Sequence, residues 1–207
     1  QTACGAVDIA MHTIERYFCP GEDTYLTDSI AEAVIKSTRK AAFDCMKNPD
    51  DYTARANMMW ASSLAHNGLT QCGREFQLVV HQFEHELSGM YPKIAHGAGL
   101  AALWCSWARY VYKANISRWL QYSANVWNLD IDYEHPEKTI EEAINLQEQY
   151  YVSLGMPIGL KALGVEEASL TKLALNCSRN KTRTLTGYKP LAYDDILAIY
   201  QMAYERG

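Results

Sequence analysis

The chain has 207 residues, of which 48% are hydrophobic and 21% charged, and its formal net charge is −5. This length and hydrophobic content predict a domain whose core needs no disulfide or metal support. The acidic balance argues against a nucleic-acid-binding protein, and no apolar run approaches the roughly 18 residues of a membrane span.

Helical periodicity begins close to the first residue. Apolar residues recur at helical spacing and predict a helix over residues 5–18, which Pro20 and Gly21 end. Thr27 and Asp28 can cap a second helix that reaches about residue 46. A third helix follows the Asn-Pro-Asp-Asp stop and reaches about residue 67.

The remainder of the chain also favours helices over strands. Pro136 suits the first turn of its helix, and the stretch 183–188 is too polar for a core strand. The basic cluster of Arg179, Lys181 and Arg183 indicates a solvated loop. Further helices fit residues 76–90, 97–113, 115–127, 136–153, 166–178 and 191–205. We therefore predict one all-α domain of about eight or nine helices.

The six cysteines include no Cys-x-x-Cys pair, and most of them have apolar neighbours. Apolar neighbours are typical of cysteines that are buried as small hydrophobic residues, so we expect reduced thiols in a cytoplasmic protein. No signal peptide is recognisable. Because a helical pattern starts almost at once after Gln1, we expect the chain to be a segment of a longer protein.

Two pairs of potential metal ligands have helical spacing. Asp8 and His12 are four residues apart, as are His81 and His85, so each pair shares one helix face. His96 follows at the expected start of the next helix. Three imidazoles and one carboxylate suit a mononuclear site for Fe, Zn, Co or Ni.

Spacing alone leaves other interpretations open. An Asp-x-x-x-His pair is also typical of a salt bridge or a cap, and helical histidines are often ordinary core or surface residues. A His-Glu-x-x-His metalloprotease is excluded, because no second histidine stands at the required position after His85-Glu86.

Several segments resemble conserved blocks of the iron-containing alcohol dehydrogenases. The first is Cys4 to Tyr17, Cys-Gly-Ala-Val-Asp-Ile-Ala-Met-His-Thr-Ile-Glu-Arg-Tyr. Met58 to Gly68 and His81 to Gly99 resemble the next two blocks. The runs Ala98 to Trp104 and Trp107 to Tyr110 are similar to the butanol dehydrogenase branch. The resemblance covers nearly the whole chain and implies a helical domain of the dehydroquinate synthase-like type.

The resemblance also implies roles for individual residues. In the family one aspartate and three histidines hold the metal, and by motif these match Asp8, His12, His81 and His96. The family's additional active-site histidine, near the nicotinamide, matches His85. One departure concerns the stretch before His96, which is one residue longer than the family's usual spacing and which a surface turn can absorb.

The implied reaction interconverts primary alcohols and aldehydes of the butanol type with NAD(P)H. The implied metal is Fe2+, with Zn2+ or Ni2+ as possible substitutes, acting on the substrate oxygen. Four residues, Trp60, Phe83, Met90 and Trp104, are candidates for an apolar substrate pocket, although each is also a candidate for plain core packing.

The cofactor half of such an enzyme is expected outside this chain. The family's Gly-Gly-Gly-Ser phosphate loop belongs to an N-terminal nucleotide-binding domain, and no such run occurs here. Residues 1–207 would then be the C-terminal metal-binding domain, inactive alone. The expected partners are a small alcohol or aldehyde and further copies in a homo-oligomer, with neither nucleic acid nor membrane.

Two rival interpretations remain. A zinc-dependent relative, such as the polyol-oxidising glycerol dehydrogenases or a dehydroquinate synthase, shares the helical domain. The three-histidine pattern favours the iron group. The second rival is a catalytically inert helical module, against which the intact ligand set argues. Metal analysis of the purified chain distinguishes these classes.

Overall fold

Nine α-helices make up most of residues 1–21 and 23–206, which are the residues described by the computed structural model. The helices are α1 (Thr2–Tyr17), α2 (Tyr25–Lys47), α3 (Tyr52–His66), α4 (Val79–Met90), α5 (His96–Val111), α6 (Ile116–Trp127), α7 (Pro136–Ser153), α8 (Leu170–Cys177) and α9 (Tyr193–Glu205). Across the described residues, β-structure is limited to two isolated bridges. The predicted all-α class and the helix number are confirmed.

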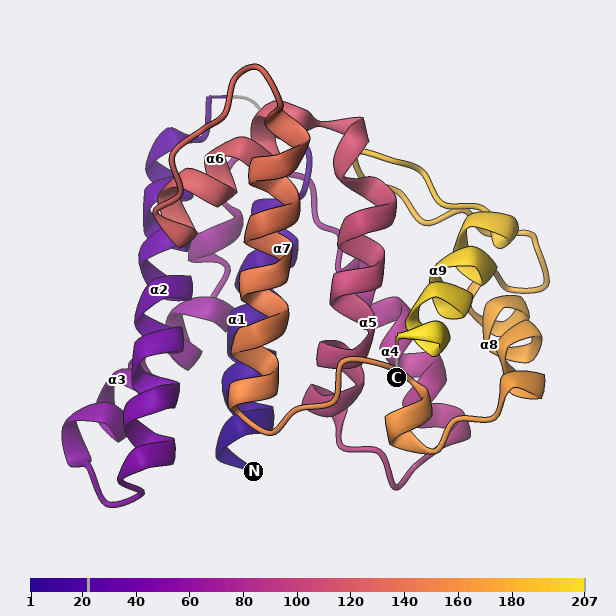
Figure 1. Ribbon diagram of the computed structural model, residues 1–207, viewed down its shortest axis with the longest axis horizontal. Helices are drawn as coiled ribbons and strands as arrows, with labels where there is room; N and C mark the ends of the chain where they lie inside the picture. Colours follow the sequence, from indigo (N-terminus) through magenta and orange to yellow (C-terminus); the bar gives the residue numbers. More distant parts are fainter. Residues whose placement is uncertain (22, 207) are drawn as a thin grey trace.

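Helix α5 forms the centre of the molecule. Its residues from Gly97 to Ala108 are all buried, as expected for a helix that is apolar around its whole circumference. In Figure 1, α1 and α7 lie on one side of α5, and α4, α8 and α9 lie on the other. Helices α2 and α3 cover the outer side of α1 (Figure 1). Helix α5 thus packs against both α1 and α4.

The start of α2 differs from the prediction. It begins at Tyr25 after Thr24, and no side chain caps it. Asp28 is buried instead, where it pairs with Arg74 and accepts a hydrogen bond of 2.9 Å from Arg118 Nη2. Thr27 Oγ1 donates to Cys72 O. The two predicted capping side chains thus bind other segments. For Asp28 the reason is that two buried guanidinium groups are stronger partners for a carboxylate than helix amides are.

Helices α1 and α5 approach each other closely at Gly97. A Cβ atom added there would lie 2.7 Å from the carbonyl carbon of Cys4, and closer still to its oxygen. Only glycine fits without a shift of one backbone. This contact sets the residue before it, His96, beside the first two turns of α1.

The cysteines and the basic segment agree with the predictions. All six cysteines are free thiols. Arg179 and Lys181 are exposed in the loop after α8, and Arg183 is half-buried there. Within residues 1–21 and 23–206, no helix is long and apolar enough to cross a membrane.

Candidate metal centre

Asp8 and His12 lie one turn apart on the same face of α1. His12 Nε2 is 3.6 Å from Asp8 Oδ1. The Asp8 side chain is 30% exposed and the His12 side chain 17%, so this face of α1 is only partly covered. The four-residue spacing therefore produces the predicted juxtaposition.

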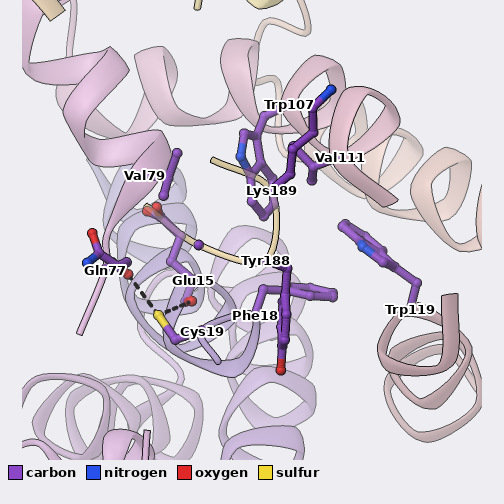
Figure 2. Close-up of a pocket in the computed structure, with 11 residues that line it drawn as sticks. Glu15, Phe18, Cys19, Gln77, Val79, Trp107, Val111, Trp119, Tyr188 and Lys189 are labelled. Atoms are coloured by element: carbon purple, nitrogen blue, oxygen red, sulfur yellow. Dashed lines mark hydrogen bonds between the residues drawn. The ribbon is translucent and has the colours of Figure 1, made fainter. Parts of the chain in front are cut away.

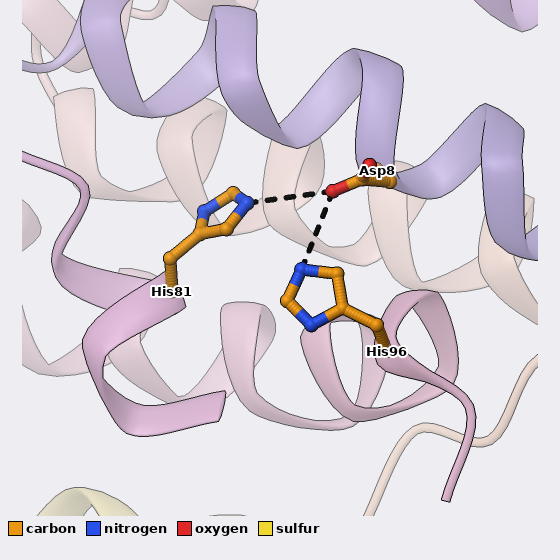
Figure 3. A group of neighbouring side chains, drawn as sticks. All are labelled: Asp8, His81 and His96. Carbon is orange, nitrogen blue, oxygen red and sulfur yellow. Dashed lines mark hydrogen bonds and ion pairs between the residues drawn. The ribbon is translucent and has the colours of Figure 1, made fainter. Parts of the chain in front are cut away.

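Helices α4 and α5 bring two more imidazoles to the same oxygen. His81 Nε2 and His96 Nε2 each lie 3.4 Å from Asp8 Oδ1 (Figure 3). His81 is buried, whereas 37% of the His96 side chain is exposed. The ring centroids of His12 and His81 are 4.3 Å apart. The structure thus gathers all four residues of the predicted ligand set, and their role as ligands stays a prediction.

The lengthened stretch before His96 does not displace this residue. Met90 ends α4, and a turn follows in which the Ile94 amide donates to the carbonyl oxygen of Tyr91. Ala95 is then the N-cap of α5 and His96 its first residue. The turn between the two helices accommodates the length, so His96 still faces Asp8.

Glu15 holds His81 from behind. This carboxylate is buried and binds Nδ1 of His81, and it also accepts the Val80 amide at 2.5 Å. The Val80 and His81 amides lie in the first turn of α4, where helix N–H groups lack partners within the helix. Glu15 therefore caps α4 and orients His81 at the same time.

Glu84 does the same for His96. Its side chain is fully buried, binds Nδ1 of His96 and accepts the Ser88 hydroxyl at 2.5 Å. Gly99 leaves room for it, because a Cβ atom there would lie 2.8 Å from Glu84 Cγ. A carboxylate at Nδ1 leaves Nε2 free to face Asp8, which is the arrangement of metal-bound histidines.

Neither glutamate is among the site residues predicted from the sequence. Glu15 follows Asp8 and His12 on the same helix face, at positions i, i+4 and i+7, and this periodicity was a usable signal. Glu84 precedes His85 directly and had no comparable signal, because its partner His96 comes from another helix. His12 lacks such support, and its Nδ1 is buried without a hydrogen-bond partner among the described residues.

Burial, hydrogen bonds and neighbouring charges shift the pKa values of Asp8 and of the histidines around it. Burial opposes ionisation of Asp8, but hydrogen bonds from His81 and His96 hold the pKa of Asp8 well below its usual range. Burial opposes the charged form of His81, and Asp8 and Glu15 outweigh it and raise its pKa to about 9. Hydrogen bonds to Asp8 and Glu84 raise the pKa of His96 to about 10. Burial lowers the pKa of His12 to about 3.

The donor geometry fits a divalent transition metal ion. Ligand atoms about 2.1 Å from one tetrahedral ion lie about 3.4 Å apart. The distances of 3.4 to 3.6 Å from Asp8 Oδ1 to the imidazole nitrogens match this separation. Asp8, His81 and His96 each offer one donor atom within 4.8 Å of the others. Nitrogen and oxygen donors without thiolate suit Fe2+, Zn2+ or Ni2+.

His85 lies at the exposed rim of the cluster. Its ring is stacked on that of His96 at 5.7 Å between centroids and lies 6.0 Å from the ring of His81. Burial, followed by the charge of His81, lowers the pKa of His85. The residue is exposed and thus borders the donors from the solvent side.

For two of the four candidate pocket residues the structure favours core packing, the alternative that the sequence left open. Phe83 and Trp104 are fully buried in the hydrophobic core, because they lie on the faces of α4 and α5 that pack against other helices. Met90 is half-buried against that core. Trp60 is 65% exposed and borders a groove between α2 and α3.

A small cavity of about 30 Å³ adjoins Glu15 (Figure 2). Aromatic side chains form much of its wall, and Phe18 and Trp119 are stacked with 4.0 Å between ring centroids. Neither Asp8 nor any histidine is among its lining residues. The predicted metal donors do not line this cavity, although Glu15 adjoins both, and the donor chemistry argues for the cluster as the functional site.

Comparison with known families gives one match over almost the whole chain. The sequence model described as "Fe-containing alcohol dehydrogenase family, C-terminal" matches residues 2–204. NADH-dependent butanol dehydrogenase A of Clostridium acetobutylicum is 39% identical over 205 residues, which are 99% of this chain and 52% of that protein. NADPH-dependent aldehyde reductase YqhD of Escherichia coli is 30% identical over 98% of this chain and 52% of its own.

The fold agrees with these sequence matches. The crystal structure of NADH-dependent butanol dehydrogenase A from Thermotoga maritima superposes with a TM-score of 0.91 at 31% identity. The superposition covers 99% of this chain and 52% of that one. The chain therefore spans about half the length of the relatives that it matches.

Proposed function

This chain belongs to the Fe-containing alcohol dehydrogenase family, and we propose that it is the metal-binding half of an enzyme that interconverts primary alcohols and aldehydes. The names of the relatives support this substrate class, since they include butanol dehydrogenases and an aldehyde reductase. They also name NADH or NADPH as the cofactor. The substrate is thus a small alcohol or aldehyde of the butanol type.

The observation that supports the proposal best is the convergence of three imidazole nitrogens on Asp8 Oδ1. Three helices contribute, and buried carboxylates fix two of the imidazoles. In this proposal Asp8, His12, His81 and His96 hold the ion, which the family name indicates to be iron. Zinc or nickel can replace it, because both bind such donors more tightly than ferrous iron.

Asp8, His12, His81 and His96 would hold the ion, which would supply Lewis acid chemistry at the oxygen of the alcohol or aldehyde. Glu15 and Glu84 keep protons on Nδ1 of His81 and His96, so both Nε2 lone pairs point at the ion position. A ring nitrogen of His85 accepts the hydroxyl proton during oxidation and returns it during reduction. His85 is placed for this step because it borders the cluster without belonging to the group around Asp8.

The nicotinamide cofactor has its main binding surface in another part of the protein in this proposal. The relatives named as NADH- or NADPH-dependent are about twice as long as this chain. The chain itself contains no Gly-Gly-Gly-Ser run for the phosphates. Residues 1–207 then correspond to the C-terminal domain, and assembly as a homo-oligomer stays a prediction.

Metal titration tests the site. The purified chain, titrated with Fe2+ without oxygen or with Zn2+, should bind one equivalent tightly. His12→Ala or His81→Ala should abolish that tight binding, because each removes a donor. His85→Ala should retain it and serves as the matched control on α4. Tight binding that is unchanged in both donor variants would refute the assignment.

An activity assay tests whether the main cofactor site lies outside residues 1–207. The longer protein that contains this chain should reduce butanal with NADH or NADPH and lose the reaction on His12→Ala. The 207-residue chain alone, loaded with metal, should show no such turnover. Robust turnover by the chain alone would show that the cofactor site lies within residues 1–207.

A further inference from the structure

His66 lies beside the donor cluster but outside the predicted ligand set. It is the last residue of α3, and its ring centroid is 4.1 Å from that of His12. Asp8, His12 and His66 each offer one donor atom within 4.8 Å of the others. The His12 ring thus has His66 as a neighbour at 4.1 Å and His81 at 4.3 Å.

A buried hydrogen bond fixes this position. Arg16 Nη1 donates to Ala65 O at 2.6 Å and to His12 O at 3.0 Å. A cation at the C-terminal end of a helix meets carbonyl groups that lack partners and the negative end of the helix dipole. Arg16 therefore ties the end of α3 to the turn of α1 that carries His12.

A hydrogen bond at Nδ1 of His66 leaves Nε2 as the ring nitrogen that can bind a metal ion. Nδ1 lies 2.8 Å from the carbonyl oxygen of Ser62. A carbonyl oxygen only accepts hydrogen bonds, so Nδ1 carries the proton and the neutral ring keeps its lone pair on Nε2. His66 is also exposed, so an ion can reach it directly from solvent.

Three groups of possible donors occur among the described residues. Two of them contain Asp8 and share only that residue, and the third is Glu84, His85 and His96. The inner group is Asp8, His81 and His96, and the outer group is Asp8, His12 and His66. All three ion pairs of Asp8 with histidines use Oδ1. A carboxylate with a second oxygen can bridge two ions about 3.5–4 Å apart, as it does in two-metal sites.

We propose that Asp8, His12 and His66 form a second, outer position for a divalent transition metal ion such as Zn2+ or Ni2+. This inference depends on the proposed function, because the inner ion is the one which that function requires. An outer ion takes His12 away from the inner ion and shares Asp8 with it. The outer position therefore binds its ion more weakly than the inner one does.

Calorimetric titration with Zn2+ alone, checked by metal analysis after dialysis, tests the outer position. The wild-type chain should bind one tight equivalent and a second with a dissociation constant at least about tenfold larger. His66→Leu should retain only the tight equivalent. His135→Leu is the matched control, because it removes another exposed histidine, the N-cap of α7, that belongs to none of the donor groups, and it should bind both equivalents.

The inner and outer positions are separated by a third variant. His81→Ala should lose the tight equivalent and keep the weaker one, and the double variant with His66→Leu should bind neither. Saturation of the wild type at one tight equivalent would overturn the outer position and leave the proposed function intact. A second equivalent that survives His66→Leu would overturn it as well. If the wild type lacked any tight equivalent, the proposed function itself would fail.

Discussion

Two buried glutamates act on the proposed metal donors through the imidazoles that they bind. Glu84 is fully buried, and a carboxylate in such a place is stable only when charged or hydrogen-bonded groups surround it. His96 and the Ser88 hydroxyl supply these groups. Glu84 therefore sets the direction of the His96 lone pair and adds negative charge behind a cationic site.

Substitution of Glu84 measures this contribution. Glu84→Ala should weaken metal binding by about 10- to 100-fold, the usual effect of removing a partner of a metal-bound histidine. Glu84→Gln should recover part of the loss, because its amide oxygen still accepts the Nδ1 proton. Chelator competition gives the affinities, and the absorption spectrum of the Co2+-loaded chain reports the donor geometry.

Glu86→Ala is the control, since Glu86 lies on the same helix without contacting a donor. Equal affinities for Glu84→Ala and Glu86→Ala would show that Glu84 serves only the packing of α4 against α5. For Glu84→Gln we expect a lower metal affinity and an unchanged Co2+ spectrum, because this substitution removes the negative charge and keeps the hydrogen bond to Nδ1.

The residue scale also shows what the sequence could reveal. Asp8, His12, His81 and His96 could be found because helical spacing pairs the first two and a family motif contains the others. Glu84 and His66 could not, since each meets its partner across two helices. Their roles depend on how α3, α4 and α5 pack, and single-sequence periodicity carries no information on such contacts.

At the scale of elements, periodicity predicted the existence of each helix better than its ends. Helix α4 begins at Val79 and not at residue 76. Glu15 of another helix caps it there, and the preceding residues are held elsewhere, with the Gln77 carbonyl accepting the Cys19 thiol. Helix α1 begins at Thr2, three residues earlier than predicted. Helix ends are set by partners from other segments, which the local pattern does not contain.

Gly97→Ala tests the contact that positions His96. The added Cβ atom would lie 2.7 Å from the Cys4 carbonyl carbon, so α1 and α5 must separate. We expect a loss of at least about 1–3 kcal/mol in the free energy of unfolding, as for other overpacked contacts, together with weaker metal binding. Urea denaturation with and without Zn2+ measures both.

Gly89→Ala provides the comparison. Gly89 lies in α4 with open space around its would-be Cβ atom, so alanine should stabilise the helix by up to about 1 kcal/mol. The two substitutions should change the free energy of unfolding in opposite directions, and this difference is the test. If Gly97→Ala were as harmless as Gly89→Ala, the close approach of α1 and α5 would not constrain the site.

At the scale of the whole molecule, the cluster joins helices that are far apart in the sequence. Asp8 lies on α1, whereas His81 lies in the first turn of α4 and His96 is the first residue of α5. Their contacts lie where α1, α4 and α5 meet, so the site exists only when these three helices are assembled. An ion bound there is therefore linked to folding of the entire domain, because the unfolded chain does not present the donors together.

Metal binding should for this reason stabilise the whole domain. At a free Zn2+ concentration 100 times the dissociation constant of the tight site, the added stability is about 2.7 kcal/mol. For a domain of this size that corresponds to a rise in Tm of about 5–11 °C. Calorimetry of the wild-type chain should show the rise with Zn2+ and its reversal by a chelator, and His81→Ala should show neither. A tight equivalent bound with no rise in Tm would mean that the unfolded chain binds Zn2+ equally well, and the assembled cluster would then not be the site of binding.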